Sequence, residues 1–208
     1  MKNFIAKMGA VLLASAAALT FTACDLGGGL KDSRDGKTYK TVKIGKQVWM
    51  AENLNYQTGE SKCYENKPEN CDKYGRLYVW REAVTACPDG WHLPNGQELE
   101  DLKALAGQKA GDIDMAGTVL KSTTGWNDYK GNSGNGTDGL GFGALPAGYY
   151  YSDNDRFDGE GNDAFFWSST ERNSDRAYYL GLGYDFENAR VGYYSKSSAF
   201  SVRCVKNP

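Results

Sequence analysis

The sequence predicts an α+β domain in which short helices pack on a twisted, mostly antiparallel sheet. Helix signals gather between residues 80 and 121, and strand patterns separated by Gly-rich turns follow from residue 149 to the C-terminus. Four cysteines within the folded region suggest covalent links between early and late parts of the chain. The chain has 24 Lys and Arg residues and 26 Asp and Glu residues, so it is mildly acidic. This balance argues against nucleic acid as a partner, because affinity for nucleic acid comes mostly from neutralising its phosphates.

The first 23 residues have the pattern of an export signal. Lys2 and Lys7 form a positive start, and the apolar run that follows ends at Ala23, too short for the roughly 20 residues that cross a membrane. The letters FTAC, which end at Cys24, resemble a bacterial lipobox, in which the cysteine is diacylated and becomes the first residue of the mature protein. We therefore expect a lipoprotein held by Cys24 in a lipid membrane of the bacterial cell envelope, at the outer membrane or cell surface in preference to the inner membrane. Cleavage without lipidation, which leaves Cys24 free or paired, is the alternative.

Residues 24–37 form the next segment and read CDLGGGLKDSRDGK. Because this stretch is Gly-rich and polar, it is expected to be a flexible tether. The remaining residues, 38–206, have the length of a single domain.

The folded region opens with a predicted hairpin. Val42 and Ile44 alternate with polar residues, Gly45 and Lys46 suit a two-residue turn, and residues 48–50 resume the alternation.

Three helices are expected next. The first covers residues 80–86. The second has the clearest signals: Asn95 as its N-cap, Glu98 at the capping-box position, and Gly107 placed to end it. A third, short helix is expected at residues 113–121.

Strands dominate the last third of the chain. Their predicted ranges are 149–151, 165–169, 177–182, 190–194 and 199–205. In the last of these, Phe200, Val202 and Cys204 share a face, so Cys204 should point into the core.

Export implies an oxidising compartment, in which disulfides persist. Cys63, Cys71, Cys87 and Cys204 admit three pairings. Cys63 and Cys71 bracket a polar loop that can bring its own ends together, which leaves Cys87 to bond Cys204 across most of the domain. A zinc site is a poor alternative, because no C-x-x-C occurs and His92 is the only histidine.

Several motifs, in this order, carry a family resemblance: VKIGKQVWMAENLNY, YGRLYVW, CPDGWHLPNGQELEDL, GFGALPAGYY, AFFWSST and SVRC. Together they resemble the Fibrobacter succinogenes major paralogous domain over residues 32–206, a family of largely exported proteins and lipoproteins without a defined function. More distantly, GWHLPNGQELEDL and the late SVRC are similar to the C-terminal domain of Legionella collagen-like adhesin and to formylglycine-generating enzymes. These relatives imply a C-type-lectin-like fold, with a disulfide from the first helix to the last strand at the positions of Cys87 and Cys204.

The sequence argues against an enzyme. Formylglycine-generating enzymes depend on a pair of reactive cysteines in a late, His-containing segment, which this chain lacks. His92 stands in a GWHLP turn, where a structural role is expected, and no nucleophile-elbow, metalloprotease or phosphate-loop motif occurs. No pattern singles out a carboxylate pair for glycoside hydrolysis among the 26 acidic residues.

No cofactor is expected, although the sequence leaves calcium open. The loop SDNDRFDGEGND supplies four weak candidate ligands, Asp153, Asp155, Asp158 and Asp163, with the oxygen donors that Ca²⁺ prefers. The loop departs from EF-hand spacing and lacks the closing Glu, so a solvated hairpin tip is the plainer interpretation.

Aromatic residues are the last signal. The 14 Tyr and 5 Trp are many for this length, and they gather in doublets on the predicted strands. In a doublet one ring points to each face, so about half of these rings should face solvent, where they can stack on sugars. Cross-strand pairs that merely stabilise the sheet are the alternative. The candidate ligand-binding residues are Trp126, Tyr150, Tyr151, Tyr179, Tyr193 and Tyr194.

The sequence thus predicts a non-enzymatic, lipid-anchored envelope protein that binds extracellular polysaccharide or glycan. A structural or protein-interaction lipoprotein without a sugar site is the rival hypothesis, and an enzyme of the formylglycine-generating type is the third. No pattern indicates the oligomeric state.

Overall fold

The computed structural model describes residues 29–208, so the expected signal peptide and the expected lipidation site Cys24 lie outside the described residues. The larger sheet consists of β5 (Leu77–Val79), β9 (Ala147–Tyr151), β10 (Arg156–Glu160), β11 (Asp163–Glu171), β12 (Arg176–Gly183), β13 (Arg190–Ser195) and β14 (Ala199–Ser201). The smaller sheet consists of β3 (Thr41–Ile44), β4 (Gln47–Met50), β6 (Trp91–His92) and β15 (Val205–Lys206). Two short ribbons pair β1 (Leu30–Lys31) with β2 (Thr38–Tyr39) and β7 (Asp128–Tyr129) with β8 (Asn132–Ser133).

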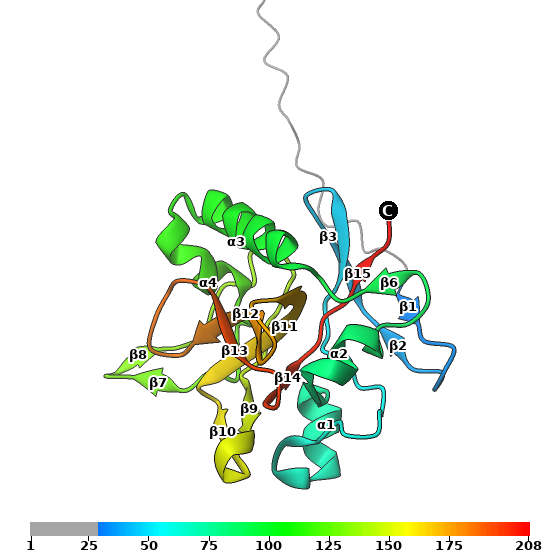
Figure 1. Ribbon diagram of the computed structural model, residues 1–208. Coiled ribbons are helices and arrows are strands. Elements are labelled where there is room, and N and C mark those ends of the chain that lie inside the picture. The colour runs from blue at the N-terminus through cyan, green and yellow to red at the C-terminus, as the bar shows by residue number, and fades with distance from the viewer. Residues whose placement is uncertain (1–28) are drawn as a thin grey trace, which may run out of the picture.

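The helices are short, as predicted. They are α1 (Pro68–Tyr74), α2 (Trp80–Ala86), α3 (Gly96–Ala110) and α4 (Ala116–Leu120), with 3₁₀ turns at Tyr64–Asn66, Ile113–Met115 and Ser152–Asn154. The larger sheet has the order β10-β9-β14-β11-β12-β13, with β5 beside β14, and the smaller has the order β3-β4-β15-β6. Most pairs are antiparallel, while β11 runs parallel to β14 and β9. The predicted α+β class is therefore confirmed (Figure 1).

The N-cap signals place the start of α3 correctly. The Asn95 side chain accepts a hydrogen bond from the Glu98 amide at 3.0 Å, and the Glu98 carboxylate accepts one from the Asn95 amide at 2.8 Å. The predicted end at Gly107 is wrong, because the helix continues to Ala110 and stops at Gly111, whose φ is 80°. Gly107 serves packing instead, since a Cβ there would lie 2.7 Å from Cδ1 of Ile113.

Residues 63–71, predicted to be a polar loop, contain a 3₁₀ turn and the start of α1. Pro68 occupies the first turn of α1, where its missing N–H has no intrahelical role. The helix ends at Gly75, which adopts a φ of 75° that favours glycine.

The folded part also begins earlier than the expected boundary at residue 38. β1 pairs with β2, and the carboxylate of buried Asp32 accepts two hydrogen bonds from the Arg34 guanidinium, at 2.9 and 2.7 Å. Arg34 donates a further bond to the carbonyl of Ala86 at 2.8 Å, so this segment is attached to the end of α2. Residues 30–37 therefore belong to the folded domain and not to the expected tether.

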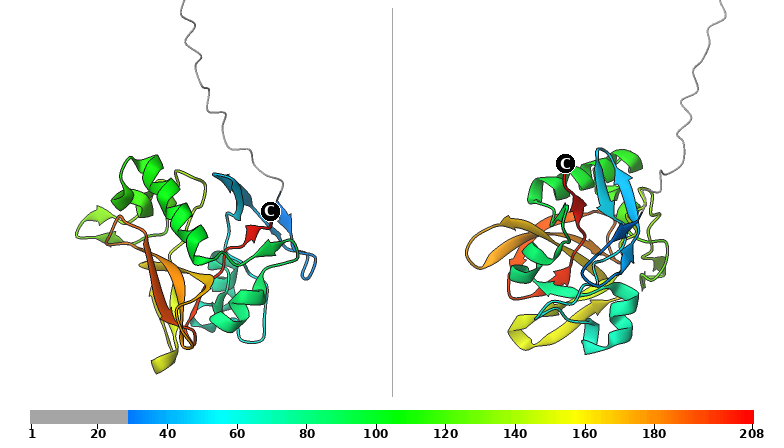
Figure 2. Two further views of the ribbon diagram at one scale, coloured as in Figure 1. Left: turned by 45° about the horizontal axis from the view of Figure 1, so that its top comes forward. Right: turned by 90° about the vertical axis from the view of Figure 1, so that its right-hand side faces the viewer.

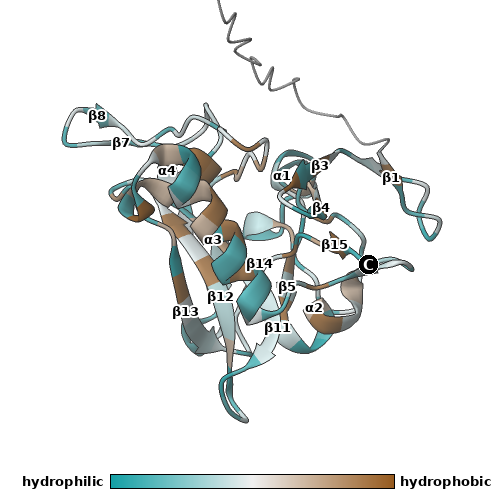
Figure 3. Cartoon of the chain, turned by 90° about the horizontal axis from the view of Figure 1, so that it is seen from above, coloured by the Kyte–Doolittle hydropathy of each residue, from teal (hydrophilic) through white to brown (hydrophobic). Residues whose placement is uncertain are grey.

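The larger sheet is covered by helices on one face. Leu99 and Leu102 of α3 and Leu120 of α4 pack against Phe166 of β11 and Leu182 of β12. α2, α3 and α4 alternate between hydrophobic and hydrophilic segments, as expected of helices with one buried side (Figure 3).

The opposite face of the larger sheet is buried at only one end. There Trp167 of β11 and Phe200 of β14 pack with Ala83 of α2, and the Trp167 and Phe200 rings are stacked with centroids 4.2 Å apart. The rest of this face carries residues that are only partly buried.

The C-terminal segment joins the two sheets. The single strand predicted over residues 199–205 is wrong, because the chain leaves the larger sheet after Ser201 and enters the smaller one at Val205 (Figure 1, red; Figure 2). Between them, the carbonyls of Val202 and Cys204 accept hydrogen bonds from the amides of Leu54 and Met50, both at 2.9 Å. Cys204 is fully buried, as predicted.

Both predicted disulfides are confirmed. Cys63 bonds Cys71 and Cys87 bonds Cys204, with Cα atoms 4.9 and 5.8 Å apart respectively. The first closes a local loop, and the second connects the end of α2 to the C-terminal segment.

Removing the Cys87–Cys204 bond should cost more stability than removing Cys63–Cys71. Sequence separations of 117 and 8 residues correspond, in the chain-entropy view of disulfides, to about 4.9 and about 2.6 kcal/mol. Urea unfolding of the Cys87→Ala/Cys204→Ala and Cys63→Ala/Cys71→Ala variants measures both losses. Equal losses in the two double variants would contradict this expectation.

Candidate functional site

A row of aromatic rings lies on the partly open face of the larger sheet, and we call it the tyrosine face. Its members are Tyr149 and Tyr151 of β9, Phe165 of β11, Tyr179 of β12 and Tyr194 of β13. Ring centroids are 5.1 Å apart for Tyr149 and Phe165, 5.1 Å for Phe165 and Tyr179, and 6.3 Å for Tyr179 and Tyr194. Tyr151 extends the row, with its centroid 6.2 Å from that of Tyr194. All five side chains are half-buried.

Two glycines form the floor beneath Tyr179. A Cβ at Gly181 would lie 2.8 Å from Cε2 of Tyr179, and a Cβ at Gly192 would lie 3.2 Å from Cε1 of the same ring. The ring therefore rests directly on backbone. Neighbouring rings are inclined by 46° to 89°, so the surface is ridged and not a flat platform.

Charged side chains border the tyrosine face. Register places Arg156 opposite Tyr151 and Asp158 opposite Tyr149 on β10, and Arg190 of β13 opposite Gly181, so these side chains share the face with the rings. Arg156 and Asp158 form an ion pair with 2.8 Å between Nη2 and Oδ2. One edge of the aromatic row therefore carries both a positive and a negative side chain.

Asp163 of β11 is the unusual member of this border. No residue within 29–208 donates a hydrogen bond to its carboxylate, so it is free to accept one from a ligand. Burial, followed by the nearby charges of Asp185 and Asp158, raises the pKa of Asp163 to about 6. Its protonation state therefore changes close to neutral pH.

The structure brings together three of the six candidate aromatic residues, Tyr151, Tyr179 and Tyr194. Trp126 is buried instead, and its indole N–H donates to the Ser122 hydroxyl at 3.0 Å and the Ala144 carbonyl at 3.1 Å. This buried position corrects the expectation that Trp126 contacts a ligand.

Tyr150 and Tyr193 point away from the tyrosine face. Tyr150 packs beside Phe157 at 5.3 Å, and its hydroxyl donates to Asp155 at 2.6 Å. Tyr193 is 46 % exposed at the other face of the sheet, where Tyr178 packs beside it. Tyr149 and Phe165 are absent from the predicted set, although strand alternation places Tyr149 on the same face as Tyr151.

The acidic loop does not converge on a metal. Asp153 accepts from the Tyr151 hydroxyl at 2.9 Å, Asp155 accepts from Tyr150, Asp158 pairs with Arg156, and Asp163 lies apart on the tyrosine face. Within the described part of the chain, no group of three or more His, Cys, Asp or Glu side chains is arranged to hold a metal ion.

His92 links three elements. Its Nε2 lies 3.1 Å from Glu98 Oε1, and its Nδ1 lies 2.7 Å from Asn207 Oδ1. Gln47 also donates to Glu98 at 2.7 Å. These contacts tie β6 and β4 to α3 and to the C-terminus.

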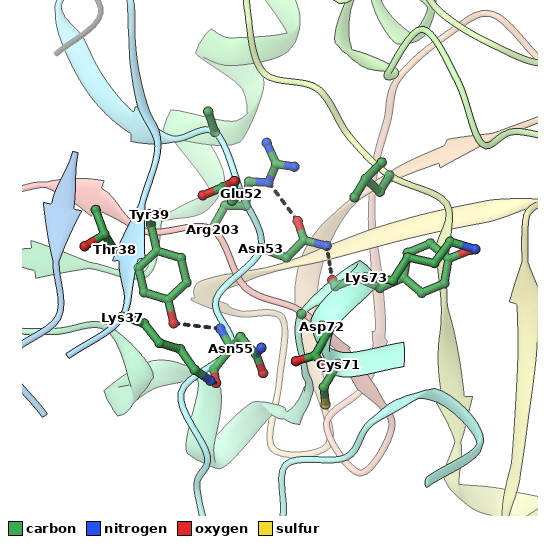
Figure 4. A pocket seen from close by; sticks show the side chains of 14 residues that line it. Lys37, Thr38, Tyr39, Glu52, Asn53, Asn55, Cys71, Asp72, Lys73 and Arg203 are labelled. Carbon is green, nitrogen blue, oxygen red and sulfur yellow. Dashed lines mark hydrogen bonds between the residues drawn. The ribbon is translucent and has the colours of Figure 1, made fainter. Parts of the chain in front are cut away.

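A hollow of about 300 Å³ lies beside buried Arg203 (Figure 4). The Arg203 guanidinium donates to Asn53 Oδ1 at 2.8 Å, to the carbonyl of Gly143 at 3.0 Å and to the carbonyl of Phe142. The Asn53 amide in turn donates to the Tyr74 carbonyl at 2.8 Å. Burial lowers the pKa of Arg203 to about 9, so it keeps its charge at neutral pH with carbonyl and amide oxygens as its partners. These bonds give Arg203 a structural role.

Comparison with known families gives one match. A family model described as the Fibrobacter succinogenes major domain matches residues 42–206. No curated protein and no solved structure matches the chain. No helix within residues 29–208 combines the length and the apolar character needed to cross a membrane.

Asp163→Asn should stabilise the domain at pH 7.5. The pKa of Asp163 is raised from 3.8 to about 6, so its stabilising contribution is complete below pH 4 and is lost as the pH rises through 6. We therefore expect the free energy of unfolding of the variant to exceed that of the wild type by about 1–3 kcal/mol at pH 7.5 and by little at pH 4. Urea unfolding at both pH values measures this, with Asp89→Asn as the control for loss of an exposed charge. A gain in stability of the same size at both pH values would contradict the raised pKa of Asp163.

Proposed function

The chain belongs to the Fibrobacter succinogenes major domain family, and we propose that it is a non-enzymatic envelope protein that binds an extracellular polysaccharide. The tyrosine face is the observation that carries this proposal. Sugars present apolar C–H faces that stack on aromatic rings, and hydroxyls that need hydrogen-bonding partners nearby. Rings bordered by Arg156, Asp158, Asp163 and Arg190 supply both kinds of contact.

The extent of the tyrosine face favours a polymer over a single sugar. Rings from β9, β11, β12 and β13 follow one another across the sheet, and strands lie about 4.8 Å apart, so the row extends on the order of 15 Å. The inclined rings make ridges, which suit one polysaccharide chain better than the flat surface of a crystalline polymer. We therefore expect soluble or amorphous polysaccharide to be the preferred ligand.

We also propose that the fold is C-type-lectin-like. Two features support this: β15 returns to pair with β4 near the start of the domain, and the Cys87–Cys204 disulfide joins the end of α2 to the C-terminal segment. The disulfide stands at the positions where the family resemblance implies one for that fold.

Cys24 is the proposed membrane anchor. Leu30 already belongs to a strand, so residues 25–29 alone separate the lipidated cysteine from the folded domain. Even fully extended, five residues reach on the order of 20 Å, so the domain would stay close to the lipid surface. The tyrosine face would then bind polysaccharide that lies close to the membrane surface.

A protein-interaction role is the second candidate, and Tyr193 favours it. The guanidinium groups of Arg172 and Arg176 lie over its exposed ring, with their central carbons 5.3 and 5.7 Å from the ring centroid. Tyr and Arg are enriched at the energetic centres of protein interfaces. This surface is separate from the tyrosine face, so variants at each can distinguish the two functions.

Tyr179→Ala and Tyr194→Ala should each weaken retention on polysaccharide by about tenfold, because each removes one stacking ring. Tyr193→Ala is the matched control, since it removes a ring from the other face. The wild type is first tested on a glycan array and in pull-downs with insoluble polysaccharides, and unfolding curves confirm that each variant is folded. No retention of the wild type on any glycan would refute the proposal, and loss of retention only in Tyr193→Ala would place the polysaccharide site on the other face of the sheet.

Cys24→Ser should release the protein from the membrane fraction of cells that express it. The hydroxyl cannot take the place of the thiol in thioether lipidation, so the variant keeps no acyl anchor. Fractionation measures the release, and mass spectrometry of the wild-type N-terminal peptide identifies the acyl groups. An unmodified N-terminal peptide in the wild type would refute the anchor.

A further inference from the structure

We propose that a second pocket, built around buried Lys121, binds a neutral sugar residue of the same ligand. This inference rests on the proposed polysaccharide binding and adds a site and a ligand class to it. We call the site the Lys121 pocket. It has a volume of about 410 Å³, within the range of about 300–1,000 Å³ typical of small-molecule sites.

Three segments that are distant in sequence form the Lys121 pocket. Thr118 comes from α4, Tyr129 and Asn132 come from the β7–β8 ribbon, and residues 184–187 come from the connection between β12 and β13. Figure 1 shows the β7–β8 ribbon projecting from the body of the domain on the same side as α4 and this connection. The pocket is therefore part of the tertiary fold and not a crease within one loop.

Lys121 supplies a buried donor. Its Nζ donates to the carbonyls of Gly183 at 3.0 Å and Phe186 at 3.3 Å, and the Trp126 ring lies behind it with its centroid 5.2 Å away. An ammonium group has three N–H donors, so one remains for a group within the pocket that Lys121 lines. Burial lowers the pKa of Lys121, and the charges of Glu187 and Asp185 partly oppose this effect.

Asp185 and Glu187 supply free acceptors. Both are exposed at the pocket, and neither carboxylate accepts a hydrogen bond or forms a close ion pair with any residue in the described range 29–208. Tyr129 and Tyr184 add an apolar wall, because their rings pack edge to face with centroids 5.5 Å apart. The pocket thus combines one donor, two acceptors and an aromatic surface.

The charges of these groups select the ligand class. An anion would be repelled by Asp185 and Glu187, and a cation would pair with these carboxylates but leave the remaining N–H donor of Lys121 without an acceptor. A neutral sugar avoids both, because its hydroxyls donate to the carboxylates and accept from the ammonium while its C–H face packs on a tyrosine ring.

The Lys121 pocket and the tyrosine face meet at the end of β12. Gly183 pairs in register with Asp163, which borders the tyrosine face, and the Gly183 carbonyl accepts the hydrogen bond from Lys121. One polysaccharide can therefore contact both sites, with a neutral residue in the pocket.

Calorimetric titration with neutral trisaccharides of glucose, xylose, mannose and galactose tests this inference on the full chain, purified with its anchor in detergent micelles. We expect at least one of them to bind, and the Asp185→Asn/Glu187→Gln variant to bind it at least tenfold more weakly, because hydrogen bonds to charged groups are lost. These exposed carboxylates have no partner within the described residues, so the variant should fold. Asp89→Asn/Glu69→Gln, at exposed positions elsewhere, is the matched control and should bind like the wild type.

Three results would overturn the inference: unchanged affinity in the Asp185→Asn/Glu187→Gln variant, tighter binding of glucuronate or glucosamine trisaccharides than of neutral ones, or no binding of any neutral trisaccharide. Polysaccharide retention by the same wild-type sample separates the two proposals. If the wild type still retains polysaccharide through Tyr179, only the Lys121 pocket is refuted. If retention is also absent, the proposed function fails with it.

Discussion

The attachment of the C-terminal segment between the two sheets is the constraint on which the rest of the structure depends. Buried Arg203 bonds Asn53 and the carbonyls of Phe142 and Gly143, and Cys204 is bonded to Cys87. These adjacent residues thus connect the start of the domain, its middle loop and α2. Because a buried guanidinium has high desolvation cost, it is tolerated only where such partners are in place.

The same segment supports the candidate binding surface. Phe200 of β14 is fully buried, and its ring contacts Phe165 at 5.1 Å, Tyr179 at 5.4 Å and Tyr194 at 5.5 Å. Trp167 stacks on Phe200 from the protein interior. The partly exposed rings are therefore held by a rigid aromatic layer, which reduces the conformational entropy that a ligand would have to remove.

Features decided by neighbouring residues could be predicted from the sequence, and features decided by distant contacts could not. The start of α3 follows from a local capping box, whereas the choice of Gly111 over Gly107 as its end does not, because Gly107 is a glycine that serves the packing of Ile113 and not a cap. The break after Ser201 depends on a second sheet that no local pattern indicates. At the site, strand alternation predicted only that the two rings of a doublet lie on opposite faces, whereas the cross-strand register decides which rings share a face, as Tyr151, Tyr179 and Tyr194 do. The buried positions of Trp126 and Lys121 arise from loops that meet only in three dimensions.

The late position of the joining segment has a consequence for biogenesis. Synthesis proceeds from the N-terminus, so β3, β4 and α2 are present well before the residues that pair with them. Until Ser201 and Val205 emerge, the larger sheet lacks a central strand, the smaller sheet lacks its link to β6, and Cys87 has no partner. Such long-range closure slows folding and leaves apolar strand edges exposed until the chain is complete. The domain therefore completes its fold only after its last residues have been made, and a truncated product would present an unpaired Cys87 thiol and open strand edges.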